Sequence, residues 1–107
     1  RVQIEKAVEE LIDKKADCII CMDDAICSRV LVKLRQEEIH VPQDVRIASF
    51  YNSSVLENST PSITSLSFDV RELGMASCKE LLQMIENESV PEKTLLTYEV
   101  VLKESTK

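Results

Sequence analysis

The stretch Cys18–Met22 constrains the fold of this chain more than any other part of it. It is a short, continuous apolar run without glycine or proline, and it stops at two carboxylates, Asp23 and Asp24. Such runs are typical of parallel strands that are covered on both faces. Ligands of open α/β sheets bind outside the carboxyl ends of the strands, so we expect any site to include Asp23 or Asp24.

Segments with helical and extended periodicity alternate along the rest of the chain. Apolar residues at helical spacing predict one helix that begins almost at the first residue and a second helix directly after Asp24. Further strands are predicted at Val45–Phe50, in shorter form at Ile63–Phe68, and at Leu95–Leu102. The order α-β-α-β-α-β predicts an α/β fold with a mostly parallel sheet flanked by helices.

Polar residues mark a loop and the start of a third helix. The segment Ser53–Ser62 is rich in Ser, Asn, Thr and Pro, which predicts a surface loop. Asp69, followed three residues later by Glu72, resembles a capping box and predicts the start of the longest helix. Gly74 in its first turns costs about 1 kcal/mol relative to alanine, so either that cost is tolerated or another backbone packs closely there.

The second helix carries one valine outside its apolar stripe. Ile26, Val30 and Leu34 lie on that stripe, whereas Val32 lies almost opposite its centre. Val32 is therefore either a lone exposed valine or part of a contact with another subunit. Either carboxylate that precedes the helix can cap its first turn.

Length and charge exclude several classes of protein. A chain of 107 residues supports one compact domain, and a net charge of -6 without a cluster of Lys or Arg argues against nucleic-acid binding by this piece alone. No apolar run approaches the roughly 20 residues that span a bilayer, and the first residues have no signal-peptide pattern. We expect a soluble chain without membrane contact.

The cysteines and the single histidine do not form a recognisable metal site. Cys18 and Cys21 are three residues apart on a predicted strand, so they point to opposite faces. Cys27 and Cys78 fall on apolar helix faces, and His40 lies in a turn. We expect four reduced, buried or half-buried thiols in a cytosolic protein, with zinc as the alternative, and we expect no cofactor.

Paired carboxylates at a strand end can also bind Mg²⁺, as in phosphoacceptor receiver domains. Such a site needs a further acid at the end of a neighbouring strand, where this chain has Tyr51 and Asn52. The sequence also lacks a Ser/His/Asp or Cys/His set. We therefore predict that the chain is not an enzyme.

Five segments, taken in order and spacing, carry a resemblance to a known family. They are Ala16–Asp24, Val41–Phe50, Thr60–Leu66, Glu72–Gly74 and Val101–Thr106. Over its whole length the chain resembles the lactose-repressor/galactose-repressor family of bacterial transcription regulators. The resemblance implies roughly the last third of a longer protein, whose helix-turn-helix DNA-binding domain and first effector subdomain lie outside this chain.

The resemblance implies a truncated, periplasmic-binding-protein-like (type I) bilobal fold. It assigns residues 1–67 and 93–107 to the C-terminal subdomain of the effector-binding domain, and residues 69–88 to a helix that packs on the absent N-terminal subdomain. In this family a sugar or nucleoside-like effector binds between the subdomains and changes the affinity for operator DNA. Without its sheet, the helix exposes an apolar patch that we expect to be swapped or shared between chains. The patch comprises Leu73, Leu81, Leu82 and Ile85.

The resemblance assigns the effector contacts to Asp23, Tyr51 and Phe68. At these positions the family usually has Asn, Asp and Gln, respectively. The two aromatic residues offer stacking faces to a sugar ring or a purine, but they lose the readout of specific hydroxyls. Alternatively, Phe68 is a core residue and Tyr51 a loop residue. With Asp23 as the effector contact, Asp24 is the favoured helix cap.

The resemblance also implies a cytoplasmic homodimer that reaches operator DNA only through the N-terminal domain. A solute-binding receptor of a transport system shares the bilobal fold and is the alternative function. The ending Leu102–Thr106 and the unpaired cysteines favour the regulator. The positions that match the family's dimer contacts are Ser28, Leu31, Val32, Arg35, Leu56 and Ser59.

Overall fold

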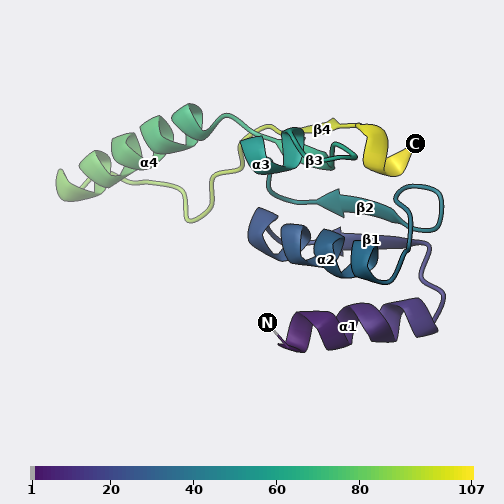
Figure 1. Cartoon of the computed structure of the whole chain (residues 1–107). Helices are drawn as coiled ribbons and strands as arrows, with labels where there is room; N and C mark the ends of the chain where they lie inside the picture. The colour runs from purple at the N-terminus through teal and green to yellow at the C-terminus, as the bar shows by residue number, and fades with distance from the viewer. Residues whose placement is uncertain (1) are drawn as a thin grey trace. The chain divides into compact units, whose positions relative to one another are not determined.

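The structure is a computed structural model that describes residues 2–107, and it divides into two compact units (Figure 1). The first unit comprises the residues up to Leu66 together with Val100–Lys107, and the second comprises Ser67–Glu99. In the structure, residues 93–99 are part of the second unit, and the assignment of residues 93–107 to the C-terminal subdomain stays a prediction.

The first unit has the predicted alternation of helices and strands. Its strands belong to one sheet in the order β1-β2-β3-β4. β1 pairs with β2 in parallel, as β2 does with β3, which confirms the mostly parallel sheet. The elements are α1 (Val2–Asp13), β1 (Cys18–Cys21), α2 (Asp24–Gln36), β2 (Arg46–Ser49), α3 (Ser54–Glu57), β3 (Thr64–Ser67), β4 (Glu99–Val101) and the 3-10 turn η1 (Glu104–Thr106).

The hydrophobic core of this unit lies between one face of the sheet and the helices. Leu34 of α2 and Ile47 of β2 are at most 1% exposed, and Val8 brings α1 into the same cluster. Each such side chain contributes about 1.5–3 kcal/mol through burial of its apolar surface. α1 packs against α2, and α2 packs against β1 and α3. This packing holds the strands in place and thereby fixes where their carboxyl ends lie.

Among the described residues, β1 is covered on one face only. Ile19 and Cys21 are buried, whereas Cys18 is exposed and Ile20 is 61% exposed. The prediction of a strand covered on both faces is wrong here, because the core cluster lies on the Ile19 face alone. Cys18 and Cys21 do point to opposite faces. Since Cys18 and Cys78 are exposed, the expectation of buried thiols holds only for the other two cysteines.

The second unit consists of one long helix and its flanking segments. α4 (Val70–Ile85) is capped by Asp69, whose carboxylate accepts from the backbone N–H groups of Arg71 at 3.0 Å and Glu72 at 3.1 Å. This confirms the predicted start, but the helix ends before residue 88. No side chain of α4 is buried within the described residues. That two chains swap or share this helix stays a prediction.

The structure corrects the last predicted strand and decides between the two alternatives for Gly74. Leu95–Leu102 was predicted as a strand, but only Glu99–Val101 is extended in the sheet. In the described structure, a Cβ on Gly74 meets no heavy atom within 4 Å. No backbone packs closely at Gly74 there, so the cost of glycine in the helix is tolerated.

Candidate functional site at the carboxyl edge of the sheet

Asp23 lies at the carboxyl end of β1 and caps α2. Its backbone is extended, and its Oδ1 atom accepts from the backbone N–H of Ile26 at 2.8 Å. Asp24 is instead the first residue of the helix, which corrects its assignment as the favoured cap. A carboxylate at this position also interacts favourably with the helix dipole. The cap uses one oxygen of Asp23, so the other oxygen remains for a ligand.

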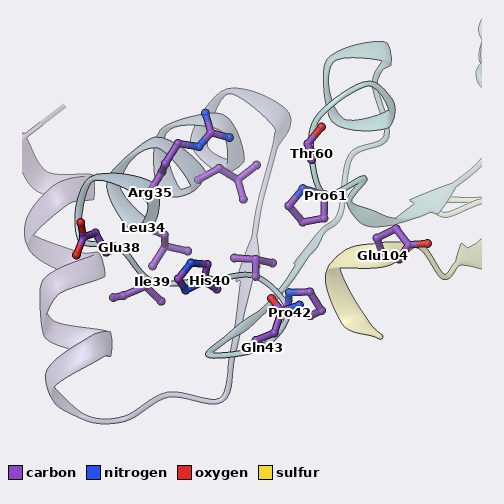
Figure 2. A pocket seen from close by; sticks show the side chains of 12 residues that line it. Leu34, Arg35, Glu38, Ile39, His40, Pro42, Gln43, Thr60, Pro61 and Glu104 are labelled. Atoms are coloured by element: carbon purple, nitrogen blue, oxygen red, sulfur yellow. The ribbon is translucent and has the colours of Figure 1, made fainter.

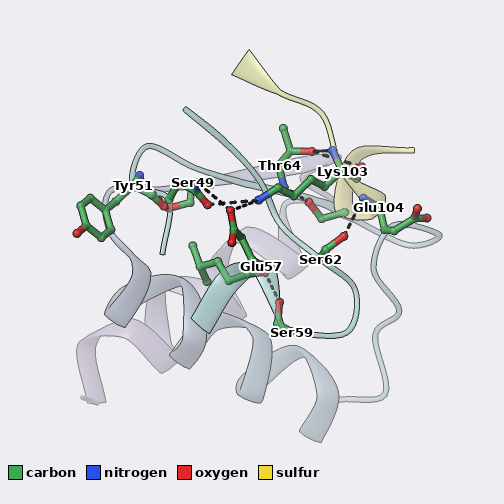
Figure 3. Close-up of polar contacts among 11 residues, drawn as sticks. Ser49, Tyr51, Glu57, Ser59, Ser62, Thr64, Lys103 and Glu104 are labelled. Carbon is green, nitrogen blue, oxygen red and sulfur yellow. Dashed lines mark hydrogen bonds and ion pairs between the residues drawn. The ribbon is translucent and has the colours of Figure 1, made fainter. Parts of the chain in front are cut away.

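Tyr51 follows the carboxyl end of the neighbouring strand, β2. The hydroxyl of Ser49 donates to the carbonyl oxygen of Tyr51 at 2.9 Å and accepts from its N–H at 3.2 Å. Ser49 is 3% exposed, so this small turn is fixed in the core. The ring of Tyr51 is 45% exposed and points away from the neighbouring polar side chains (Figure 3). It is therefore free to stack against a bound ring.

A polar cluster that the sequence did not reveal lies beside this turn (Figure 3). We call Asn52, Glu57 and Lys103 the Lys103 cluster. The ammonium of Lys103 donates to Asn52 Oδ1 at 3.2 Å and lies 3.7 Å from Glu57 Oε1. The amide nitrogen of Asn52 donates to the same carboxylate oxygen at 3.1 Å. The only signal in the sequence was that Asn52 follows Tyr51 and that Lys103 lies in the segment Val101–Thr106.

Two buried thiols flank the turn that carries Asp23. Cys21 is 3% exposed and Cys27 is fully buried. The hydrogen bond between the two thiols, together with burial, raises the pKa of Cys27 above its usual range. Cys27 is therefore a neutral thiol that packs as a small apolar residue. No group of three metal-ligating side chains occurs among residues 2–107.

Phe68 directly follows β3 and belongs to the second unit. It is 39% exposed and lines a cavity of about 470 Å³ together with Thr97 and Tyr98 of the same unit. It is thus not a core residue of the described structure. The structure brings Asp23 and Tyr51 to one edge of the sheet and places Phe68 in the other unit.

The candidate dimer residues comprise surface positions and one core residue. Val32 is 52% exposed, and Arg35 is exposed as well. Leu56 is fully buried in the core, which corrects its assignment to a dimer contact. The short helix α3 turns Leu56 inward and Val55 outward. The remaining positions are half-buried, namely Ser28, Leu31 and Ser59.

A cavity of about 470 Å³ lies next to the last turn of α2 (Figure 2). It lies near the loop that leads into β2, at the opposite end of that strand from Tyr51. Leu34 and Ile39 provide part of its apolar wall, and Glu38 and His40 are among its polar side chains. Leu31 and Arg35 also line this cavity, so the candidate dimer surface is hollowed.

Comparison with known proteins defines the class. The family model of the periplasmic binding protein-like domain matches residues 1–106, so the chain belongs to this family. Within it, the chain is similar to transcription regulators of the lactose-repressor/galactose-repressor family, which confirms the resemblance seen in the sequence. It is 26% identical over 97 residues to the arabinose metabolism transcriptional repressor of Geobacillus stearothermophilus, covering 89% of this chain and 27% of the repressor.

Solved structures support the same fold. A LacI family transcriptional regulator from Arthrobacter sp. FB24 in complex with lactose superposes with a TM-score of 0.79 and 26% identity, over 97% of this chain and 41% of that one. The lac repressor dimer bound to operator and the anti-inducer ONPF gives a TM-score of 0.83 at 17% identity, over 96% of this chain and 32% of that one.

The chain thus spans less than a third of the length of the arabinose repressor that it matches. The relatives compared are regulators rather than enzymes or transport receptors. Between residues 2 and 107, no helix has the length and apolar character needed to cross a membrane.

Proposed function

We propose that this chain is the effector-sensing and dimerising part of a cytoplasmic bacterial repressor. A sugar-like molecule binds at the carboxyl edge of the sheet and controls the operator affinity of a helix-turn-helix domain outside this chain. One observation carries the proposal: Asp23 and Tyr51 end neighbouring parallel strands of a chain whose relatives regulate transcription. Ligands of open α/β sheets bind at this edge.

The side chains at this edge suit a saccharide. The free oxygen of Asp23 accepts hydrogen bonds from hydroxyl groups, and the hydroxyl of Tyr51 both donates and accepts. The ring of Tyr51 stacks on the apolar face of a pyranose or on a purine. The lactose complex of the Arthrobacter regulator and the arabinose repressor support a sugar as the effector.

The proposed homodimer forms through the exposed side of α2. Val32 is exposed and lies off the core stripe, and Leu31 and Arg35 border the cavity beside the helix. A partner side chain can fill this hollow and bury apolar surface there. Ser28 and Ser59 complete the proposed contact surface. The lac repressor, which has the same fold, was solved as a dimer, and this supports the assignment.

A thermal-shift screen tests the proposed effector site. The protein as its gene encodes it is heated with L-arabinose, lactose, maltose or adenosine over a range of concentrations. Since a ligand that binds only the folded state stabilises it by about 2.7 kcal/mol at one hundred times its Kd, one of these compounds should raise Tm.

Matched variants locate the binding. Asp23→Ala and Tyr51→Ala should abolish the rise in Tm, whereas Asp17→Ala, which changes an exposed carboxylate before β1, should retain it. The absence of any shift, or a shift that persists in both site variants, would contradict the proposal.

A further inference from the structure

The ammonium of Lys103 is mostly buried at the carboxyl edge of the sheet. The side chain of Lys103 is 15% exposed, whereas that of Lys107, four residues later, is 69% exposed. Removing a charge from water is unfavourable unless the charge is paired and hydrogen-bonded. Asn52 and Glu57 provide this compensation, so the ammonium joins the loop that follows β2 to the short helix α3.

Both polar atoms of the Asn52 amide take part in this interaction. Its amide oxygen accepts from Lys103 and its amide nitrogen donates to Glu57. The two bonds therefore fix the orientation of the amide. Tyr51 directly precedes Asn52, and its own backbone groups are held by Ser49. The direction of the Tyr51 ring thus depends on Ser49 on one side and on Asn52 on the other.

The backbone of Lys103 is tied to the strand that leads into the second unit. Its N–H donates to Thr64 Oγ1 at 2.8 Å, and the same hydroxyl lies 3.4 Å from its carbonyl oxygen. Thr64 begins β3, from which the chain enters the second unit, and Lys103 follows β4, by which it returns. Lys103 thus contacts the Asn52 loop through its side chain and Thr64 of β3 through its backbone, and it directly follows the segment that returns from the second unit.

We propose that Lys103 is the positioning residue of the effector loop Tyr51–Asn52. Through Asn52 and Glu57 it holds the Tyr51 ring in the direction that receives a ligand. Because the same residue is bonded to Thr64, a change in the two connections and a change at Tyr51 are coupled through it. That the loop Tyr51–Asn52 contacts an effector rests on the proposed function. The coupling between Lys103 and Tyr51 can be measured without a ligand.

Fluorine NMR tests this in the ligand-free protein as its gene encodes it, labelled with 3-fluorotyrosine. The Tyr51 signal is assigned with Tyr51→Phe, and Tyr98, in the second unit, serves as the internal reference. Lys103→Met should move or broaden the Tyr51 signal by more than it changes the Tyr98 signal. Amide exchange at Tyr51, Glu57 and Asn58 should rise roughly tenfold, as expected when a charged hydrogen bond is lost.

Two further variants distinguish a role of Lys103 in positioning Tyr51 from a general effect on the stability of the protein. Lys103→Arg should restore the Tyr51 signal, and Lys107→Met should leave it unchanged. A Lys103→Met protein with a lower Tm but an unchanged Tyr51 signal would overturn the proposal, as would an equal change in Lys107→Met.

A second variant covers the case in which Lys103→Met does not fold. Glu57→Gln removes the charge that attracts Lys103 but keeps an acceptor for Asn52. A smaller shift of the Tyr51 signal in the same direction supports the proposal, and an unchanged signal overturns it. Since no sugar is present, a failed search for an effector would defeat the proposed function without altering this result.

Discussion

The hydroxyl of Ser105 donates to the carbonyl oxygen of Ile47 at 2.6 Å, across 58 residues of sequence. The hydroxyl oxygen of Ser105 in turn accepts from the backbone N–H of Thr64 at 2.8 Å. One side chain thus bridges β2 and β3 at a point where two backbone groups need partners, and Ser105 itself is fully buried. Buried N–H and C=O groups are nearly always paired, so this hydroxyl completes the sheet.

Ser105→Ala should lower the free energy of unfolding. The change leaves the Ile47 carbonyl and the Thr64 N–H unpaired, and each unpaired buried group costs about 1–3 kcal/mol. Urea denaturation measures the effect. Ser54→Ala, at an exposed serine of α3, is the control and should change stability by less than about 0.5 kcal/mol. Equal stabilities of the two variants would show that the bridge contributes nothing.

Asp23→Ala should destabilise α2 by about 1 kcal/mol, because the N–H of Ile26 loses its cap. Asp23→Ser keeps an acceptor at the cap and should retain most of the stability, so it separates capping from ligand contact. Thermal unfolding of the ligand-free protein checks both. Asp24→Ala is the comparison, and a larger loss there than in Asp23→Ala would contradict the assignment of the cap.

Val32→Glu should raise the dissociation constant of the proposed dimer about tenfold or more, because it places a charge at an apolar contact. A tenfold change corresponds to about 1.4 kcal/mol. Sedimentation equilibrium measures the dissociation constant. Val2→Glu, at a valine of α1 that is 61% exposed, is the matched control and should dimerise normally. A wild-type constant for Val32→Glu would remove α2 from the interface.

Gly74→Ala should stabilise α4 by up to about 1 kcal/mol, because alanine has the higher helix propensity and its Cβ meets no atom here. Circular dichroism during thermal unfolding reports the gain. Ala76→Gly, in the same helix, should have the opposite sign. A loss of stability in Gly74→Ala would mean that another backbone approaches this position in the protein as its gene encodes it.

The parts of the fold that could be predicted depend on local sequence. The apolar run at Cys18–Met22 defined β1, and the polar start at Asp69 defined α4, because strand burial and helix capping involve neighbouring residues. Whether one or both faces of β1 are buried could not be predicted. A continuous apolar run is the same whether Ile20 is covered or exposed, and the answer depends on which elements pack on that side.

Only part of the candidate site could be identified from local sequence patterns. The strand end at Asp23 is recognisable in the sequence, whereas Tyr51 was assigned through the family resemblance, and both effector contacts stay predictions. Leu56 was assigned to the dimer by its match to the family's contact positions, and the sequence did not reveal the short helix α3 that turns it into the core. The link between Asn52 and Lys103 joins residues 51 positions apart, and no local pattern encodes it.

The bridge at Ser105 also bears on how the chain is made. Synthesis must pass through the whole of Ser67–Glu99 before Ser105 emerges and reaches β2 and β3. Contacts between such distant residues form slowly, and until they do, the edge of β3 has unpaired backbone groups. An unpaired edge is a site where nascent chains pair with one another. The order of translation thus leaves the edge of β3 unpaired until Ser105 has emerged.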